Sequence, residues 1–200
     1  MRLWVHEGAR LFHDRLVTDA ERTWALSMLK ETAERHFPQS HFPGASAATS
    51  AQPQLLLTDW LQGELAEVEV AALREHLRQR ARTFQQEELG LPLVVFDEAV
   101  QHVLRIARVF RQPVGHMLLI GHSGVGKTVL TRFAAWMDGL SLHQINASRA
   151  YTAQKFQEDL RALLRRTGVW GERVCFIFDE ANAVDARYGP CRTGQTPRPP

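Results

Sequence analysis

The chain has 200 residues, 44% of them apolar, which is enough to bury a sizeable hydrophobic core. Its 24 basic and 22 acidic side chains leave a formal net charge of +2 and form no basic stripe of the kind that nucleic-acid binding requires. No apolar run approaches the length that crosses a membrane, and charged residues interrupt the start of the chain, where a signal peptide would be apolar. We therefore expect a cytoplasmic protein with no direct nucleic-acid partner and no membrane partner.

The first predicted elements are two short helices. Leucines and tryptophans recur at helical spacing over residues 3–36, and Thr18 and Asp19 offer a break between the helices. This piece is too short to hold a core by itself, so we expect it to pack on another part of the protein. Residues 37–53 are rich in Pro, Ser, Ala and Gly, as is typical of a surface connection, and we predict a linker over residues 37–60.

Two amphipathic helices are predicted next. Between residues 61 and 88 the apolar positions step by about one helical turn, and they are Leu65, Leu73, Leu77, Ala81 and Phe84. A second helix ends before Pro113, and one of its faces carries Phe96, Val100, Val103, Leu104, Ala107 and Phe110.

After Pro113 the pattern changes to strands that alternate with helices. HMLLIG, SLHQINA and RVCFIF are short apolar runs that predict strands, and TVLTRFAAWM after the first run is helical. Another helix is capped by Thr152 and ended by Gly168, and one of its faces carries Phe156, Leu160, Leu163 and Leu164. This order predicts an α/β fold with a parallel sheet covered on both faces.

A phosphate-binding loop is the first chemical motif. GHSGVGKT, residues 121–128, has the pattern of Gly, four residues, Gly, Lys and Ser or Thr, between a predicted strand and a helix. The glycines let backbone amides face phosphate oxygens, Lys127 can neutralise the β- and γ-phosphates, and the Thr128 hydroxyl can bind magnesium. The alternative is a glycine-rich turn that contains Lys-Thr by chance. The predicted nucleotide-binding residues are Gly121, His122, Ser123, Gly124, Val125, Gly126, Lys127 and Thr128.

Two adjacent carboxylates form the second motif. Asp179 and Glu180 follow the strand VCFIF, and ligands of open parallel sheets lie at the carboxyl ends of strands. We predict that Asp179 holds magnesium and that Glu180 acts as the general base on the attacking water. The alternative for such an acidic pair is a solvated turn.

Hydrolysis also needs a water-positioning polar group, a cation for the transition state and a lid. Nothing after Asp185 supplies them, and residues 187–200 are rich in Pro, Gly and Arg, so we expect a disordered tail. We accordingly expect weak nucleotide binding with little or no hydrolysis.

The same residues resemble one family. The segments RVFRQPVGHMLLIGHSGVGKTVLTRFAAWMDGLSLHQI, RAYTAQKFQEDLRALLRRTG and FIFDEANAVD are similar to the fourth AAA+ module of cytoplasmic dynein heavy chains. LWVHEGARLFHDRLVTDAERTW resembles the helical end of the third module. The resemblance extends from about Leu3 to Asp185.

The resemblance implies four regions: residues 1–36 from the preceding module, the linker 37–60, a truncated AAA+ large subdomain at 61–186, and the tail 187–200. It implies ATP or ADP at the loop, magnesium at Thr128 and Asp179, Glu180 as catalytic base, and adenine near Leu93 to Phe96. AAA+ sheets have the strand order 5-1-4-3-2, so a fourth strand would lie between the first and third. Since this chain offers no fourth strand, we expect an incomplete P-loop NTPase sheet.

The family also implies a parent protein that is a minus-end-directed microtubule motor ATPase of the cytoskeleton. Its partners would be the rest of the AAA+ ring, other dynein subunits and, only through parts absent here, microtubules. Two alternatives stay open. The chain could be a stand-alone P-loop kinase, or a binding module that nucleotide only stabilises.

Overall fold

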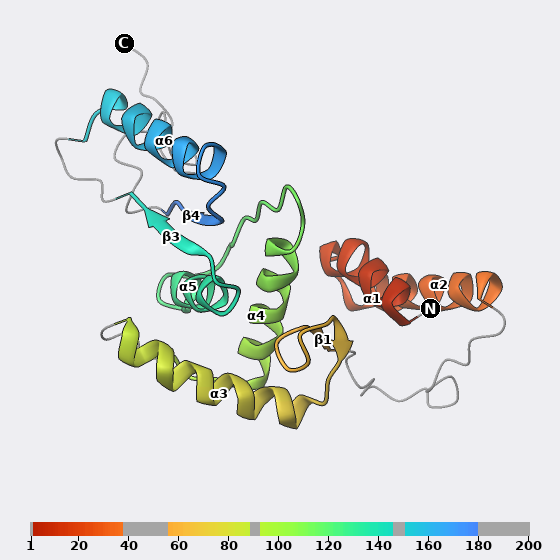
Figure 1. Ribbon diagram of the computed structural model, residues 1–200. Helices are drawn as coiled ribbons and strands as arrows, with labels where there is room; N and C mark the ends of the chain where they lie inside the picture. Colours follow the sequence, from red (N-terminus) through yellow and green to blue (C-terminus); the bar gives the residue numbers. More distant parts are fainter. Residues whose placement is uncertain (1, 38–55, 89–92, 146–150, 180–200) are drawn as a thin grey trace, which may run out of the picture. The chain divides into compact units, whose positions relative to one another are not determined.

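The computed structural model describes residues 2–37, 56–88, 93–145 and 151–179. The chain divides into two compact units, Met1–Leu55 and Leu56–Pro200 (Figure 1). No helix within the described residues is long and apolar enough to cross a membrane. Glu180 and the predicted tail at 187–200 lie outside the described residues.

The first unit is a pair of helices. Helix α1 spans Arg2–Leu11, the short 3-10 helix η1 spans His13–Arg15, and α2 spans Asp19–His36. The hydroxyl of Thr18 accepts from the Glu21 amide at 3.3 Å, and the Glu21 carboxylate accepts from the Thr18 amide at 3.1 Å. This reciprocal capping box starts α2 and confirms the predicted break between two helices.

Small side chains let α1 and α2 approach closely. A methyl group added at Gly8 would lie 2.7 Å from the Leu29 side chain, and Ala25 and Ala33 are buried on the same helix as Leu29.

The second unit begins with a two-stranded hairpin that the sequence pattern did not predict. Strands β1 (Leu57–Thr58) and β2 (Ala66–Glu67) pair antiparallel. The turn between them contains Gly63, whose φ of 76° lies in the left-handed region that favours glycine. The prediction of a helix from residue 61 is therefore wrong for its first turns, and Leu65 precedes β2 and is largely exposed.

Three helices form the main hydrophobic core of this unit. They are α3 (Val70–Glu87), α4 (Asp97–Phe110) and α5 (Lys127–Met137). Phe84 of α3 meets Phe133 and Trp136 of α5 with ring centroids 5.4 and 5.6 Å apart. The predicted faces of α3 and α4 are confirmed for the buried residues Leu73, Leu77, Ala81, Phe84, Val100, Val103, Leu104 and Ala107. The prediction is wrong for Phe96, which is the N-cap of α4 and is 54% exposed.

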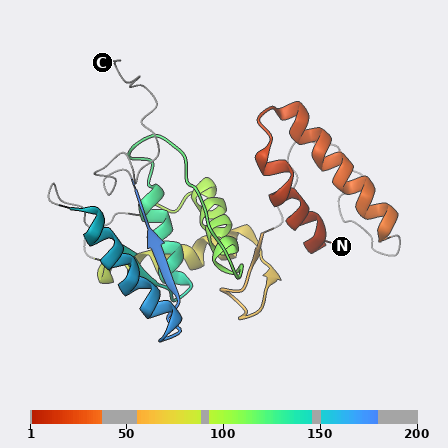
Figure 2. The same ribbon diagram turned by 90° about the horizontal axis from the view of Figure 1, so that it is seen from above.

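A parallel pair of strands lies between two helices. Strands β3 (Ser141–Gln144) and β4 (Val174–Ile177) are adjacent and parallel, with Leu142 opposite Cys175. Figures 1 and 2 show these strands between α5 and α6 (Ala153–Gly168). The prediction that SLHQINA and RVCFIF form parallel strands is confirmed.

The prediction that HMLLIG forms a strand is wrong. Residues 115–122 have no regular secondary structure, and the side chains of Leu118 and Ile120 are 81% and 87% exposed. A strand needs a ladder partner for its backbone N–H and C=O groups. The run HMLLIG pairs with neither β3 nor β4, and the described ranges contain no further strand of this sheet, so it has no ladder partner there.

Helix α6 follows the sequence prediction at its start and departs from it at its end. The Thr152 hydroxyl accepts from the Lys155 amide at 3.3 Å, as predicted. Leu163 is buried, but Leu164 is 66% exposed and does not share its face. Gly168 is the last helical residue, and Gly171, with φ of 66°, takes the left-handed conformation that commonly follows a helix end.

Candidate functional site

The glycine-rich loop leads directly into α5. Gly124 and Gly126 have φ values of 81° and 84°, so both positions need the left-handed conformation that residues with a Cβ rarely adopt. Gly126 is also the N-cap of α5. The two glycines therefore shape the turn that connects the exposed segment before the loop to the helix.

The ammonium group of Lys127 lies inside the curve of this loop. Its Nζ donates to the carbonyl oxygens of Gly121 at 2.8 Å and His122 at 2.7 Å. These two contacts tie the first turn of α5 back to the start of the loop. They also place one positive charge where the loop backbone converges.

The amino terminus of α5 has no side-chain cap. Gly126 cannot cap it, and the first turn carries no acidic residue. The first amides of a helix carry partial positive charge and need acceptors, which a bound anion can provide. The loop, Lys127 and this helix terminus together suit a phosphate group, and the half-buried Thr128 lies in the same turn.

Asp179 follows β4 by two residues, at the carboxyl edge of the parallel pair. Its Oδ2 accepts from Nε2 of Gln144, the last residue of β3, at 2.9 Å. The acidic pair after VCFIF predicts Asp179, whereas no motif singles out Gln144. The sequence signal for Gln144 is that it is a polar residue in the predicted strand SLHQINA, next to Ile145, which is buried.

The donor set fits magnesium as far as the described residues extend. Magnesium prefers oxygen ligands and keeps several waters while it binds one or two protein groups and substrate phosphates. Thr128 and Asp179 offer a hydroxyl and a carboxylate. Within residues 2–37, 56–88, 93–145 and 151–179, no group of three or more His, Cys, Asp or Glu side chains is placed to hold a metal by itself. The second predicted catalytic residue, Glu180, is outside these ranges.

The segment predicted to lie near adenine alternates between partly buried and exposed side chains. Leu93 and Val95 pack against the main core, and the Leu93 carbonyl accepts from Gln85 at 3.2 Å. Val94 and Phe96 are 73% and 54% exposed. Val94 and Phe96 are therefore the most exposed side chains of the segment.

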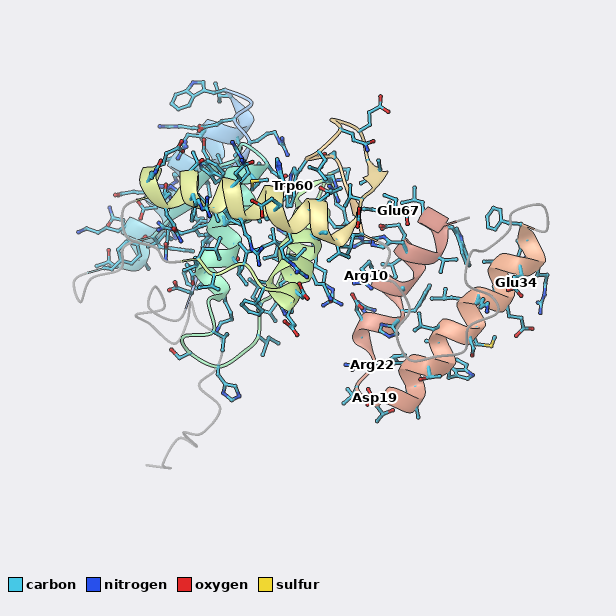
Figure 3. The ribbon with its side chains drawn as sticks, turned by 90° about the horizontal axis from the view of Figure 1, so that it is seen from below. Arg10, Asp19, Arg22, Glu34, Trp60 and Glu67 are labelled. Carbon is cyan, nitrogen blue, oxygen red and sulfur yellow. The ribbon has the colours of Figure 1, made fainter. Side chains whose placement is uncertain are left out.

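A polar cluster lies at the opposite edge of the parallel pair, near the amino ends of its strands. The Trp60 indole donates to Asp138 at 2.8 Å, and Arg111 pairs with Asp59 at 3.0 Å (Trp60 is labelled in Figure 3). Burial raises the pKa of Asp138. This cluster joins the hairpin to the ends of α4 and α5, and the sequence analysis did not find it because its members are far apart along the chain.

The loop geometry matches one part of the P-loop arrangement. A glycine-rich loop that closes on a lysine at the start of a helix is found in P-loop proteins, whereas the strand that precedes such a loop is not formed by residues 115–122. Residues 91–188 match the family described as P-loop containing dynein motor region D4.

Longer proteins show the same relationship over nearly the whole chain. The cytoplasmic dynein heavy chain of Drosophila melanogaster is 48% identical over 188 residues, which are 94% of this chain and 4% of that protein. Those of Dictyostelium discoideum and Neurospora crassa are 45% and 44% identical over the same shares. The chain belongs to the dynein heavy-chain family, and it spans about 4% of the length of the curated relatives it matches.

Proposed function

We propose that residues 61–186 are the nucleotide-binding part of an AAA-type dynein motor module, with residues 1–36 from the end of the preceding module. In this proposal the loop 121–128 holds the phosphates of ATP or ADP. The observation that carries it is the Lys127 ammonium, held by two loop carbonyls at the uncapped start of α5.

The roles of the other site residues follow from their chemistry. Thr128 and Asp179 would bind magnesium, which when bound supplies positive charge to the phosphate oxygens. Glu180 would accept a proton from the attacking water. Val94 and Phe96 are the exposed side chains of the segment proposed to lie near adenine.

The 200-residue chain by itself should bind nucleotide weakly and hydrolyse it little. The segment before the loop is exposed, and no described strand pairs with it. A loop held mainly by α5 and Lys127 loses more conformational freedom on binding a ligand than a loop that also follows a paired strand. This loss lowers its affinity for nucleotide.

The parent protein in this proposal is a microtubule-based, minus-end-directed motor ATPase of the cytoplasm and cytoskeleton. The family match and the three cytoplasmic relatives support this proposal. The chain would act there beside the rest of the AAA+ ring and other dynein subunits, and microtubules would be reached through other parts of the parent.

Fluorescent ATP-analogue titration of the purified chain tests the proposal. Lys127→Ala removes a charge-assisted donor to phosphate, so we expect at least about tenfold weaker binding. Lys155→Ala removes an exposed lysine of α6 and is the matched control, with unchanged affinity expected. Equal affinity in wild type and Lys127→Ala would contradict a phosphate site at this loop.

Steady-state ATP turnover tests the expectation of low hydrolytic activity. We expect little ATP hydrolysis by the chain alone. Sustained hydrolysis that Glu180→Gln abolishes would overturn the expectation of low activity and, at the same time, support the assigned base.

A further inference from the structure

We propose that Gln144 is a positioning residue for the magnesium carboxylate, and that its side-chain amide holds Asp179 in the orientation that binds the ion. This inference rests on the proposed nucleotide site. The observation behind it is the 2.9 Å hydrogen bond from Gln144 Nε2 to Asp179 Oδ2, which joins the ends of two neighbouring strands.

Strand geometry places the two side chains on the same face of the sheet. Side chains alternate between the two faces of a strand. On β3, Leu142 packs against the cluster that contains Ala135 of α5, and His143 meets Phe176 at 5.9 Å between ring centroids. Gln144, two residues after Leu142, therefore returns to the face that α5 covers.

The same alternation applies to the end of β4. Ile177 packs in the cluster with Ala135, whereas the Phe178 ring lies 6.3 Å from that of Phe156 on α6. Asp179 is two residues after Ile177 and so returns to the α5 face. Helix α5 carries Lys127 and Thr128 in its first turn, and the Gln144 and Asp179 pair lies on the side of the sheet that this helix covers.

The contact uses one oxygen of the carboxylate. An amide N–H that donates to Oδ2 restricts rotation of the carboxylate. Carboxylates that bind metals are commonly oriented by such outer hydrogen bonds, and their loss costs about 10- to 100-fold in metal affinity. Gln144 would act in this way on Asp179 without touching the nucleotide.

A merely structural role for Gln144 makes a different prediction. Its side chain is half-buried at the last position of β3, and the core on this face consists of apolar side chains. If the Gln144 amide only stabilised the end of β3, its removal would lower the stability of the fold. It would then weaken nucleotide binding equally with and without magnesium. If it orients Asp179, removal would affect only the magnesium-dependent part.

Magnesium titrations separate the two roles. Binding of a fluorescent ATP analogue to the 200-residue chain is measured in EDTA and across a range of Mg²⁺ concentrations. Gln144→Met keeps the length of the side chain and removes the donor, so we expect the Mg²⁺ midpoint to rise about tenfold. Affinity in EDTA should stay within about twofold, since phosphate contacts through the loop remain.

Gln154→Met is the matched control. Gln154 also donates to a carboxylate, that of Glu158 at 3.2 Å, but on the exposed surface of α6. We expect it to leave both affinities unchanged. In an Asp179→Ala background, Gln144→Met should cause no additional change in the Mg²⁺ midpoint, because the group that it orients is gone.

The outcomes distinguish this inference from the site on which it rests. A wild-type chain that binds nucleotide with Mg²⁺ dependence, together with an unchanged midpoint in Gln144→Met, would overturn the role of Gln144 alone. A wild-type chain that binds no nucleotide would overturn the nucleotide site and this inference with it.

Nuclear magnetic resonance of glutamine-labelled chain covers the case in which Gln144→Met does not fold. The Gln144 side-chain amide resonances should move on Asp179→Ala while those of Gln154 stay in place. Resonances of Gln144 that do not respond would overturn the contact itself.

Discussion

The helical core and the loop-bearing edge of the second unit differ in how they are held. The core is closed by aromatic rings of α3 and α5, with Phe84 and Phe133 almost fully buried. The segment at the other extreme, residues 117–120, exposes four consecutive apolar side chains, two of them by more than 80%. The best-packed part of this unit is therefore separate from the edge that carries the proposed nucleotide site.

The difference shows what a helix and a strand each need from the rest of the chain. Helices α3 and α5 satisfy their backbone hydrogen bonds internally, and the partners for their apolar faces are nearby. A strand depends on a neighbour for its backbone as well as for its faces. Apolar composition alone therefore does not form a strand at residues 117–120.

The largest expected effect lies in the aromatic core. Phe133→Ala removes a ring that contacts Phe84 and Trp136, so we expect a loss of about 3–5 kcal/mol in the free energy of unfolding. Urea denaturation followed by tryptophan fluorescence measures it. Phe12→Ala, at a 63% exposed position of the first unit, is the control. An equal loss of stability in this variant would contradict the special contribution of the buried aromatic core.

A pair of isoleucines compares the sheet with the exposed segment directly. Ile177→Ala, at a position 9% exposed in β4, should cost about 2 kcal/mol or more. Ile120→Ala, at a position 87% exposed, should change stability by less than about 0.5 kcal/mol. The urea denaturation midpoints of the two variants test this difference. A large loss of stability in Ile120→Ala would mean that the segment around Ile120 is packed in solution.

A smaller effect is expected where the hairpin joins the core. Trp60→Phe keeps an aromatic ring but removes the donor to the partly buried Asp138, so we expect a loss of about 1–2 kcal/mol. Trp24→Phe, at a 62% exposed position, is the matched control. Thermal unfolding of both variants tests this, and indistinguishable melting temperatures would show that the hydrogen bond adds nothing.

The smallest expected effect is a pH dependence of stability, which comes from an ion pair between the end of α6 and the segment that follows it. A bidentate hydrogen-bonded pair with Arg166, at 2.8 and 2.6 Å, lowers the pKa of Glu172 from 4.5 to about 2. A carboxyl whose pKa is lower in the folded state stabilises it above the unfolded-state pKa, and this contribution is lost as the pH falls from 4.5 towards 2.

Glu172→Gln removes that contribution. The difference in unfolding free energy between wild type and variant should therefore be largest near neutral pH and should shrink over this range. Urea midpoints measured from pH 7 to pH 2.5 test it. Glu98→Gln, at an exposed position of α4, is the control, and the same pH-dependent difference for both variants would contradict a specific pair with Arg166.

The sequence alone determined the features that depend on neighbouring residues. The buried faces of α3 and α4 follow from helical spacing, and the caps at Thr18 and Thr152 follow from local side-chain chemistry. The glycine and lysine pattern at 121–128 predicted a glycine-rich turn into a helix, and the structure has left-handed glycines at 124 and 126 directly before α5.

Contacts between distant parts of the chain were decided only by the tertiary structure. The Trp60 and Asp138 contact joins residues 78 apart in the sequence, and the Gln144 and Asp179 contact joins residues 35 apart. Residues 117–120 have the composition of a buried strand, yet they are exposed because the described strands leave them without a ladder partner. Local spacing specifies caps, turns and helix faces, whereas strand pairing and long-range hydrogen bonds require the partner to be in place.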